Sequence, residues 1–345
     1  MRVGIVSDPV YLEHDTGTHV ENANRLTSIL DALEEHNLND KLVHLTPRPA
    51  TVDEIALVHA KEYISQIHKM AERGGGMLDP DTVMSSGSYD AAVKAAGGVI
   101  TAVDAVLNKE VNTAFSLVRP PGHHATCWQA MGFCLFNNIA IAARYALAHF
   151  NLNKILIVDF DVHHGNGTQD TFYSDPNVLY FSTHQYPFYP GTGSIDETGT
   201  RDGKGFTVNV PLIGGWGDEE YQAVFEDILA PVARRFQPEL IMVSAGYDAH
   251  WADRISSMEV SVSGFVRLAE ILTILADKLC DGRLVFTLEG GYDYQALSSS
   301  VVSTLNKLLE IPEIYDPLGK RPEKALSKNF DDLINLIKDT HRIKL

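Results

Sequence analysis

The segment KILIVDFDVHHGNGTQD, which spans Lys154–Asp170, joins a short apolar run to a dense group of polar side chains. A continuous apolar run of this length, bounded by polar residues, is typical of a strand that is buried on both faces of a parallel sheet. Asp159, Asp161 and His163 then alternate along the chain, so their side chains share one face for as long as the backbone stays extended. The segment therefore predicts an α/β fold that carries chemically active groups at one edge of its sheet.

Similar apolar runs alternate with amphipathic or alanine-rich stretches along the rest of the chain. We expect strands at Gly4–Val6, Ala114–Leu117, Ile155–Val158, Val178–Phe181, Phe206–Val210, Leu240–Val243 and Leu284–Leu288. We expect helices at Arg25–Glu35, Tyr89–Leu107, Asn137–Phe150, Asp218–Phe236, Gly264–Cys280 and Asp331–Asp339. Strands separated by helices predict a mainly parallel sheet with helices on both faces.

The composition is that of a globular chain with an acidic surface. Its 345 residues are 45% hydrophobic, which is enough to bury a large core. Since no repeat or linker-like segment divides the sequence, we expect one domain over residues 1–345. The net charge of -17 argues against a basic face for nucleic acid and leaves a cationic partner or substrate compatible.

The cysteines and the amino-terminal segment bear on where the protein works. Cys127, Cys134 and Cys280 form no CxxC pair, which disfavours a disulfide framework or a cysteine zinc site and favours a reducing compartment. The amino-terminal apolar run is too short for a signal peptide, and no stretch approaches the length of a membrane span. We therefore expect a soluble cytoplasmic protein that does not bind membranes.

Polar clusters also follow other expected strands. AFSL leads to the pair His123 and His124, LIMV leads to SAGYD with Asp248, and LVFTL leads to EGGY with Tyr292. Because the carboxyl ends of parallel strands lie at one edge, where open α/β folds bind ligands, these distant segments are expected to converge.

The acidic and imidazole groups at this edge have the chemistry of a divalent metal site. A catalytic zinc needs three protein ligands drawn from histidine and carboxylates and keeps one position open. Asp161 and His163 are two candidates and Asp248 is the best-placed third, whereas we interpret His250 as a packed or surface residue. Alternatively, a single aspartate after a strand caps the next helix or accepts loop amides. Such groups so close together favour a metal, and this donor set suits Zn²⁺ and Fe²⁺ alike.

The turn RPPGHH and the motif EGGY would supply the groups around the metal. An imidazole is matched in basicity to a water that zinc has activated, and the turn could aim both His123 and His124 into one cavity. Gly290 and Gly291 let the backbone approach a ligand, while the hydroxyl of Tyr292 can stabilise an oxyanion. The alternatives are that the histidines are exposed and idle and that the tyrosine belongs to the core.

Taken together, the motifs RPPGHHA, DFDVHHGNGTQ, YPGTG, AGYDAH and LEGGY, in that order, resemble those of the zinc-dependent histone deacetylase family, including its bacterial and archaeal amidohydrolases. The resemblance covers most of the chain and its combined motifs are highly specific. It implies the arginase/deacetylase fold, a largely parallel sheet of about eight strands, and hydrolysis of acylated amines at one Zn²⁺.

Matching motifs imply two ion sites. The implied zinc ligands are Asp161, His163 and Asp248. Asp159 is then not a zinc ligand, and its implied place is behind His123 and at a structural monovalent cation, usually K⁺. That cation site also uses backbone oxygens of the segments Asp161–His163 and Ser182–Thr183.

The resemblance also implies how the catalytic work is divided. Tyr292 would donate to the oxyanion, His124 would be the principal general base and then acid, and His123 would orient or electrostatically support the water and the leaving group. Where class I deacetylases carry an aspartate behind the second histidine, HHGNG has Asn166, as in class II and many prokaryotic relatives. A neutral amide cannot stabilise imidazolium as a carboxylate does, so we expect the pKa of His124 to be less elevated.

An implied substrate channel completes the site. Its matching residues are Phe133, Tyr189, Gly132 and Gly291, with Asp81 as the rim acid that grips the substrate backbone and Arg25 as the basic residue next to an internal acetate-release cavity. The aromatic rings could equally be core residues. An apolar slot suits a lysine stem, whose methylenes pack along rings.

These observations predict a metal-dependent deacylase that releases acetate from acetyl-lysine in peptides or proteins, with acetylated polyamines as the alternative substrate. Acetylpolyamine amidohydrolases usually depart from YPGTG, which is retained here. A two-manganese ureohydrolase of the same fold would need further bridging carboxylates, whereas Ala249 follows Asp248. A non-catalytic acyl-lysine binder is disfavoured because no catalytic position is missing, and a homo-oligomer is compatible with the sequence.

Overall fold

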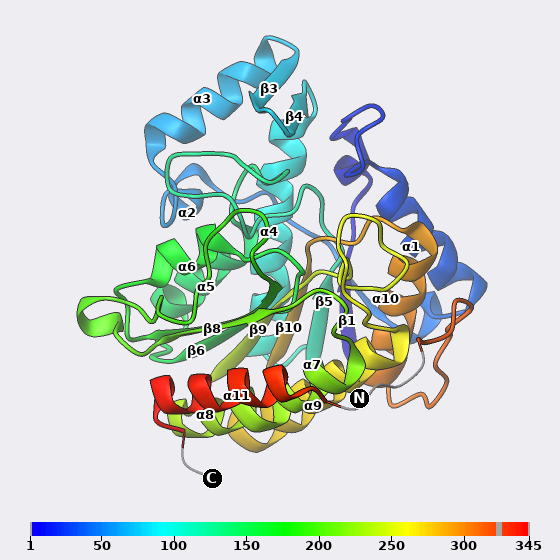
Figure 1. The fold of residues 1–345 in the computed structure, drawn as a ribbon. Coiled ribbons are helices and arrows are strands. Elements are labelled where there is room, and N and C mark those ends of the chain that lie inside the picture. Colours follow the sequence, from blue (N-terminus) through cyan, green and yellow to red (C-terminus); the bar gives the residue numbers. More distant parts are fainter. Residues whose placement is uncertain (1, 322–325, 344–345) are drawn as a thin grey trace.

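An eight-stranded sheet forms the centre of the molecule, in the order β2-β1-β5-β10-β9-β6-β7-β8 (Figure 1). The computed structural model describes residues 2–321 and 326–343. The strands are β1 (Val3–Val6), β2 (Val43–Leu45), β5 (Thr113–Ser116), β6 (Ile155–Asp159), β7 (Val178–Gln185), β8 (Thr207–Leu212), β9 (Leu240–Ala245) and β10 (Leu284–Leu288). Every pairing in this sheet is parallel, and every residue of β6, β9 and β10 is buried. The predicted α/β class and all the predicted strands are confirmed.

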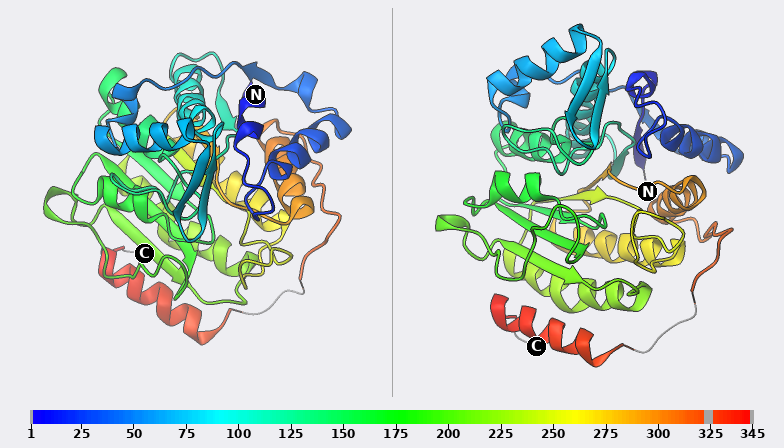
Figure 2. Two further views of the ribbon diagram at one scale, coloured as in Figure 1. Left: turned by 90° about the horizontal axis from the view of Figure 1, so that it is seen from above. Right: turned by 45° about the horizontal axis from the view of Figure 1, so that its top comes forward.

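Helices cover both faces of this sheet. One side carries α4 (Ser88–Leu107), α5 (Asn138–His149) and α6 (Asn166–Phe172), and the other carries α7 (Asp218–Val224), α8 (Ala230–Phe236) and α9 (Val262–Leu279). The views in Figure 2 place α11 (Lys328–His341) outside this second layer, while α1 (Asn24–Glu35) packs beside α10 (Tyr294–Leu308). The short elements are α2 (Val52–Ile55) and 3-10 turns at Pro9–Glu13, Asn39–Lys41 and Arg201–Gly203. None of the described helices combines the length and apolar character that a membrane span requires.

The structure also contains elements that the sequence patterns did not predict. Helix α3 (Lys61–Glu72) leads into an antiparallel hairpin of β3 (Gly75–Asp79) and β4 (Thr82–Ser85), which projects beyond the main sheet (Figure 1). The helix α10 escaped prediction because its middle, SSSVVST, is polar and β-branched, yet all of it is buried in the structure. Tertiary packing here overrides local propensity.

The long helix expected over Asp218–Phe236 is interrupted. A π-helical turn at Phe225–Leu229 separates α7 from α8, and Pro231 follows directly in the first turn of α8. Proline has no N–H to donate to the preceding turn, which accounts for a local change of helical pitch at this point.

Candidate active site

Three potential metal ligands meet where β6 and β9 end. The ligand atoms of Asp161, His163 and Asp248 all lie within 4.8 Å of one another, and all three residues are buried. Nδ1 of His163 is 3.2 Å from a carboxylate oxygen of each aspartate. One imidazole and two carboxylates are a donor set that zinc accepts. Burial and the neighbouring Asp161 raise the pKa of Asp248 to about 7, an unfavourable state for a carboxylate that a bound cation would relieve.

Backbone amides hold these carboxylates in place. The N–H of Gly290 donates to Oδ2 of Asp161 at 2.8 Å, and the N–H of Val162 donates to Oδ1 of Asp248 at 2.9 Å. Gly290 is required by the close approach, because a Cβ there would lie 2.3 Å from Oδ2 of Asp248. Strand β6 ends at Asp159, so the extended backbone on which a shared face of Asp159, Asp161 and His163 depends does not continue through Asp161 and His163.

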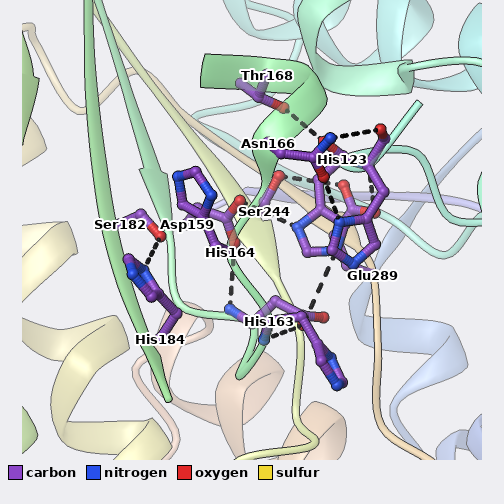
Figure 3. Close-up of polar contacts among 12 residues, drawn as sticks. His123, Asp159, His163, His164, Asn166, Thr168, Ser182, His184, Ser244 and Glu289 are labelled. Carbon is purple, nitrogen blue, oxygen red and sulfur yellow. Dashed lines mark hydrogen bonds and ion pairs between the residues drawn. The ribbon is translucent and has the colours of Figure 1, made fainter. Parts of the chain in front are cut away.

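The two adjacent histidines have different partners. Nδ1 of His123 is 3.1 Å from Oδ2 of Asp159 (Figure 3). Nδ1 of His124, by contrast, is 2.8 Å from Oδ1 of Asn166. Burial would lower the pKa of His123, but the carboxylates of Asp159 and Asp161 raise it to about 10. Burial and the neighbouring positive charge hold the pKa of His124 well below its usual value. The two rings, 4.0 Å apart between centroids, therefore differ in basicity.

Tyr292 and Arg25 form a stacked pair beside the metal ligands. The guanidinium carbon of Arg25 lies 4.8 Å from the centre of the Tyr292 ring. Its Nε donates to the carbonyl of Gly291 at 2.6 Å, and Nη2 donates to the carbonyl of Glu289. Burial raises the pKa of the Tyr292 phenol well above its usual value although Arg25 opposes this. The hydroxyl is thus a proton-bearing hydrogen-bond donor.

A cavity of about 500 Å³ connects these groups to the surface. Buried His124 and His163 lie on its inner wall, and Phe133, Gly132 and Tyr189 line it further out. The ring of Phe133 meets that of Tyr292 edge-on, with centroids 5.7 Å apart, and Tyr189 meets His124 in the same manner at 5.1 Å. Gly132 has φ of 55°, and a Cβ there would lie 2.3 Å from the His124 ring. These walls form an aromatic channel that ends at the metal ligands.

The histone deacetylase domain matches residues 19–308 of this chain. The chain belongs to the histone deacetylase family. It is 40% identical to a probable deacetylase of Archaeoglobus fulgidus, with 99% of this chain and 98% of that protein aligned. It is 42% identical to the chloroplastic histone deacetylase 10 of Oryza sativa, over 92% of this chain and 77% of the relative. The crystal structure of the HDA15 HD domain superposes with a TM-score of 0.90 at 33% identity, covering 99% of this chain and 94% of that one.

Membership of the histone deacetylase family accounts for the arginase/deacetylase fold and makes this protein a hydrolase of amide bonds. The structure also shows where the other predicted substrate-binding residues lie. Asp81, at the tip of the β3–β4 hairpin, lines the cavity mouth, where one carboxylate oxygen is 3.2 Å from Nε2 of His19. Arg25 and Gly291 are not among the described residues that line this cavity. Arg25 lies against the Tyr292 ring and donates to the carbonyl of Gly291, and the substrate contacts expected of both residues stay predictions.

The predicted monovalent cation site falls between β6 and β7. Asp159 and Ser182 are register partners on these strands, so their side chains point to the same face. Oδ2 of Asp159 accepts from the Tyr180 hydroxyl at 3.0 Å, and Oγ of Ser182 is 2.9 Å from Nδ1 of His184. The buried hydroxyl of Thr183 has no hydrogen-bond partner among the described residues and points to the opposite face. Thr183 could therefore contribute only its backbone oxygen.

Glu289 is a residue of this site that received no role from the sequence. Its fully buried carboxylate accepts the N–H groups of Gly122 at 2.7 Å and His123 at 3.2 Å through Oε2. Its Oε1 accepts the hydroxyl of Ser244 at 3.1 Å (Figure 3). Burial raises its pKa to about 7. The signal that could have found it is the acid placed directly between an apolar run and a glycine pair in LEGGY.

A second anchor of the histidine turn also escaped prediction. The buried guanidinium of Arg119 forms a two-point ion pair with Glu21, through Nε at 2.6 Å and Nη2 at 2.8 Å. Its Nη1 donates to the carbonyl of Tyr11 at 2.8 Å. His250, by contrast, is buried against Trp251, in agreement with its interpretation as a packed residue.

Proposed function

We propose that this protein is a zinc-dependent deacetylase that removes the acetyl group from the side-chain amine of acetyl-lysine in peptides or proteins. The observation that carries the proposal is the meeting of three metal-type ligands, a neutral imidazole and a phenol at the inner end of one aromatic channel. Asp161, His163 and Asp248 would hold the ion. Bound there, Zn²⁺ supplies a Lewis acid that polarises the amide carbonyl and acidifies water.

His124 would carry the proton in this reaction. Because Nδ1 of His124 faces the amide oxygen of Asn166 at 2.8 Å, this nitrogen bears the hydrogen and leaves Nε2 free to accept one. His124 takes a proton from the attacking water and delivers it to the departing amine, so that amide and water become acetate and free amine. A ring whose pKa is held low is neutral before the reaction and ready to accept.

His123 and Tyr292 would stabilise charge without transferring protons. His123, backed by the Asp159 carboxylate at 3.1 Å, is a fixed positive charge beside the reacting centre. The protonated phenol of Tyr292 donates a hydrogen bond to the oxygen that becomes negative as water adds to the carbonyl. Arg25 holds the Tyr292 ring and the carbonyl of Gly291 behind it.

The channel supports acetyl-lysine as substrate. Phe133 and Tyr189 would contact the lysine methylenes, and the exposed carboxylate of Asp81 at the mouth would accept a backbone N–H of a peptide. An acetylated polyamine has no such backbone amide. The second candidate function, polyamine deacetylation, is favoured only by the net charge of -17.

A turnover panel of acetyl-lysine peptides, acetylated polyamines and longer acyl-lysines tests this proposal. We expect acetyl-lysine peptides to be the best substrates and Asp81→Ala to impair peptides more than polyamines. Chelation of the metal and His124→Ala should each abolish turnover, whereas His44→Ala, an exposed histidine on the distant edge strand β2, should not. Turnover that survives both chelation and His124→Ala would refute the proposal.

Two further assignments belong to the same proposal. A structural K⁺ would bind the side chains of Asp159 and Ser182 with backbone oxygens of the segments 161–163 and 182–183, so that replacing K⁺ by a bulky organic cation lowers thermal stability. Reconstitution of the apoprotein with Zn²⁺ or Fe²⁺ separates the two candidate metals by specific activity. Cytoplasmic location, the absence of nucleic acid binding and a homo-oligomeric state remain predictions, and the rice relative is named as chloroplastic.

A further inference from the structure

Two adjoining cavities lie at the amino edge of the sheet, opposite the active site. The first, of about 330 Å³, is lined by Thr198, Lys204, Gly205, Arg235, Thr340, His341 and Arg342. The second, of about 420 Å³, is lined by Lys154, Pro176, Leu179, Gly205, Phe206, Val232, Arg235 and Phe236. Gly205 and Arg235 border both cavities. Since β7 has eight residues, the two edges are separated by roughly 25 Å.

The first cavity is lined by three basic side chains that form no ion pair within the described part of the chain. Lys204, Arg235 and Arg342 line it, and among the ion pairs of residues 2–321 and 326–343 none includes any of them. The guanidinium of Arg235 donates from Nη1 to the carbonyl of His341 at 2.8 Å, which positions it without cancelling its charge. Acidic residues outnumber basic ones by 45 to 28 in this chain, so three unpaired cations around one cavity are not a consequence of composition.

His341 also lines this cavity, although its Nε2 is itself buried. The residue is 5% exposed, and its Nε2 has no hydrogen-bond partner among the described residues. Burial and the nearby charges of Arg235 and Lys204 lower its pKa to about 4, so the ring is neutral at physiological pH.

The second cavity is apolar and opens beside the charged one. Leu179, Phe206, Val232 and Phe236 form its walls, and the ammonium group of Lys154 lies 5.6 Å from the centre of the Phe236 ring. A ligand that filled both cavities would carry a negative group at one end and an apolar body at the other. The two volumes fall in the range of small-molecule sites.

We propose that these two cavities form one binding site for a small organic phosphate, separate from the deacetylase centre. The phosphate group would lie between Lys204, Arg235 and Arg342. A phosphate dianion carries more charge and more acceptor oxygens than a carboxylate, so it suits a cluster of several cations better. The aromatic or aliphatic body would pack on Phe206 and Phe236. Arg235 lies in the last turn of α8, Arg342 follows α11 and Lys204 precedes β8. A ligand bound here would therefore contact all three segments.

Calorimetric titration with phenyl phosphate and with inorganic phosphate tests this proposal. The titration uses the metal-loaded protein, and substitutions at Lys204 and Arg235, on the edge opposite the deacetylase centre, assign the binding to these cavities. We expect phenyl phosphate to bind at least tenfold more tightly than inorganic phosphate and to raise Tm at saturation. Lys204→Gln and Arg235→Gln should each weaken both ligands at least tenfold, whereas Phe206→Ser should weaken phenyl phosphate alone.

Arg234→Gln provides the matched control, because Arg234 is an exposed neighbour on α8 that lines neither cavity. It should leave both affinities unchanged. Equal loss in the Arg234 and Arg235 variants would reduce the effect to general surface charge and overturn the proposal. Equal affinity for phenyl phosphate and inorganic phosphate would overturn its apolar half, and binding unaffected by Lys204→Gln would overturn its charged half. Circular dichroism of each variant verifies that loss of binding is not loss of folding.

Discussion

Replacing Glu289 by alanine should both destabilise the protein and slow catalysis. The carboxylate accepts hydrogen bonds from the N–H groups of Gly122 and His123 and from the hydroxyl of Ser244, all buried. Alanine leaves these three donors without a partner. At about 1 kcal/mol each, near the lower end of the cost of an unsatisfied buried group, the free energy of unfolding should fall by about 3 kcal/mol.

The catalytic effect follows from the position of the donors. Gly122 and His123 belong to the turn that carries His124, so loss of the anchor lets the proton-transfer group move. A misplacement of about 1 Å costs about 100-fold in rate. We expect kcat to fall by this order in folded protein, with KM and metal content little changed, because the Glu289 carboxylate hydrogen-bonds to Gly122, His123 and Ser244 rather than to a metal ligand or a channel residue.

Glu289→Gln tests whether the hydrogen bonds of Glu289 or its negative charge matter. Its amide oxygen can still accept both N–H groups, while its NH₂ can donate to Ser244, whose hydroxyl accepts as well as donates. This variant should recover most of the stability and lie within about tenfold of the wild-type kcat. Urea unfolding and steady-state kinetics measure both effects. Glu62→Ala, an exposed acid on α3, should change stability by less than about 0.5 kcal/mol. An alanine variant with wild-type stability and kcat would refute the reasoning.

Three further outcomes can be measured. Tyr292→Phe keeps the ring stacked on Arg25 but removes the donor, so kcat should fall by about 100-fold to 1,000-fold; an unchanged kcat would remove Tyr292 from catalysis. Loss of a residue that only hydrogen-bonds to a metal ligand weakens metal binding roughly 10-fold to 100-fold. Asp248→Asn should weaken zinc binding by more than this, as measured by competition with a chromogenic chelator, and a zinc affinity equal to that of the wild type would place the metal elsewhere. Burial lowers the pKa of His59 to about 4, and its Nε2 accepts the N–H of Asn137 at 2.9 Å. The unfolded chain therefore binds this proton first, so stability from neutral His59 is complete above about pH 6.5 and about 3 kcal/mol is lost as the pH falls to about 4. Urea unfolding of His59→Gln over this range should show a shallower loss, and an identical slope would contradict the assignment.

The sequence by itself determined the sheet and the edge at which chemistry occurs. A parallel strand covered by helices on both faces is apolar along most of its length. Runs such as Ile155–Val158 and Leu284–Leu288 can therefore be recognised as strands from the sequence. Since all such strands point the same way, Asp161, Asp248 and Tyr292 could be assigned to one edge from order in the chain alone.

Tertiary structure decided what depends on neighbours that are distant in sequence. The role of Glu289 arises because β10 lies beside β5, which brings the Glu289 carboxylate next to the turn at Gly122. The periodicity of a single segment does not predict the order of strands in a sheet. The difference between the pKa values of His123 and His124 sums burial and charges from several segments. Helix α10 lies between α1 and α9, where its serines and valines are buried by packing partners, not by any pattern of their own. Local sequence sets what each segment can do, but electrostatics and packing act through space, so only the assembled fold sets what each segment does.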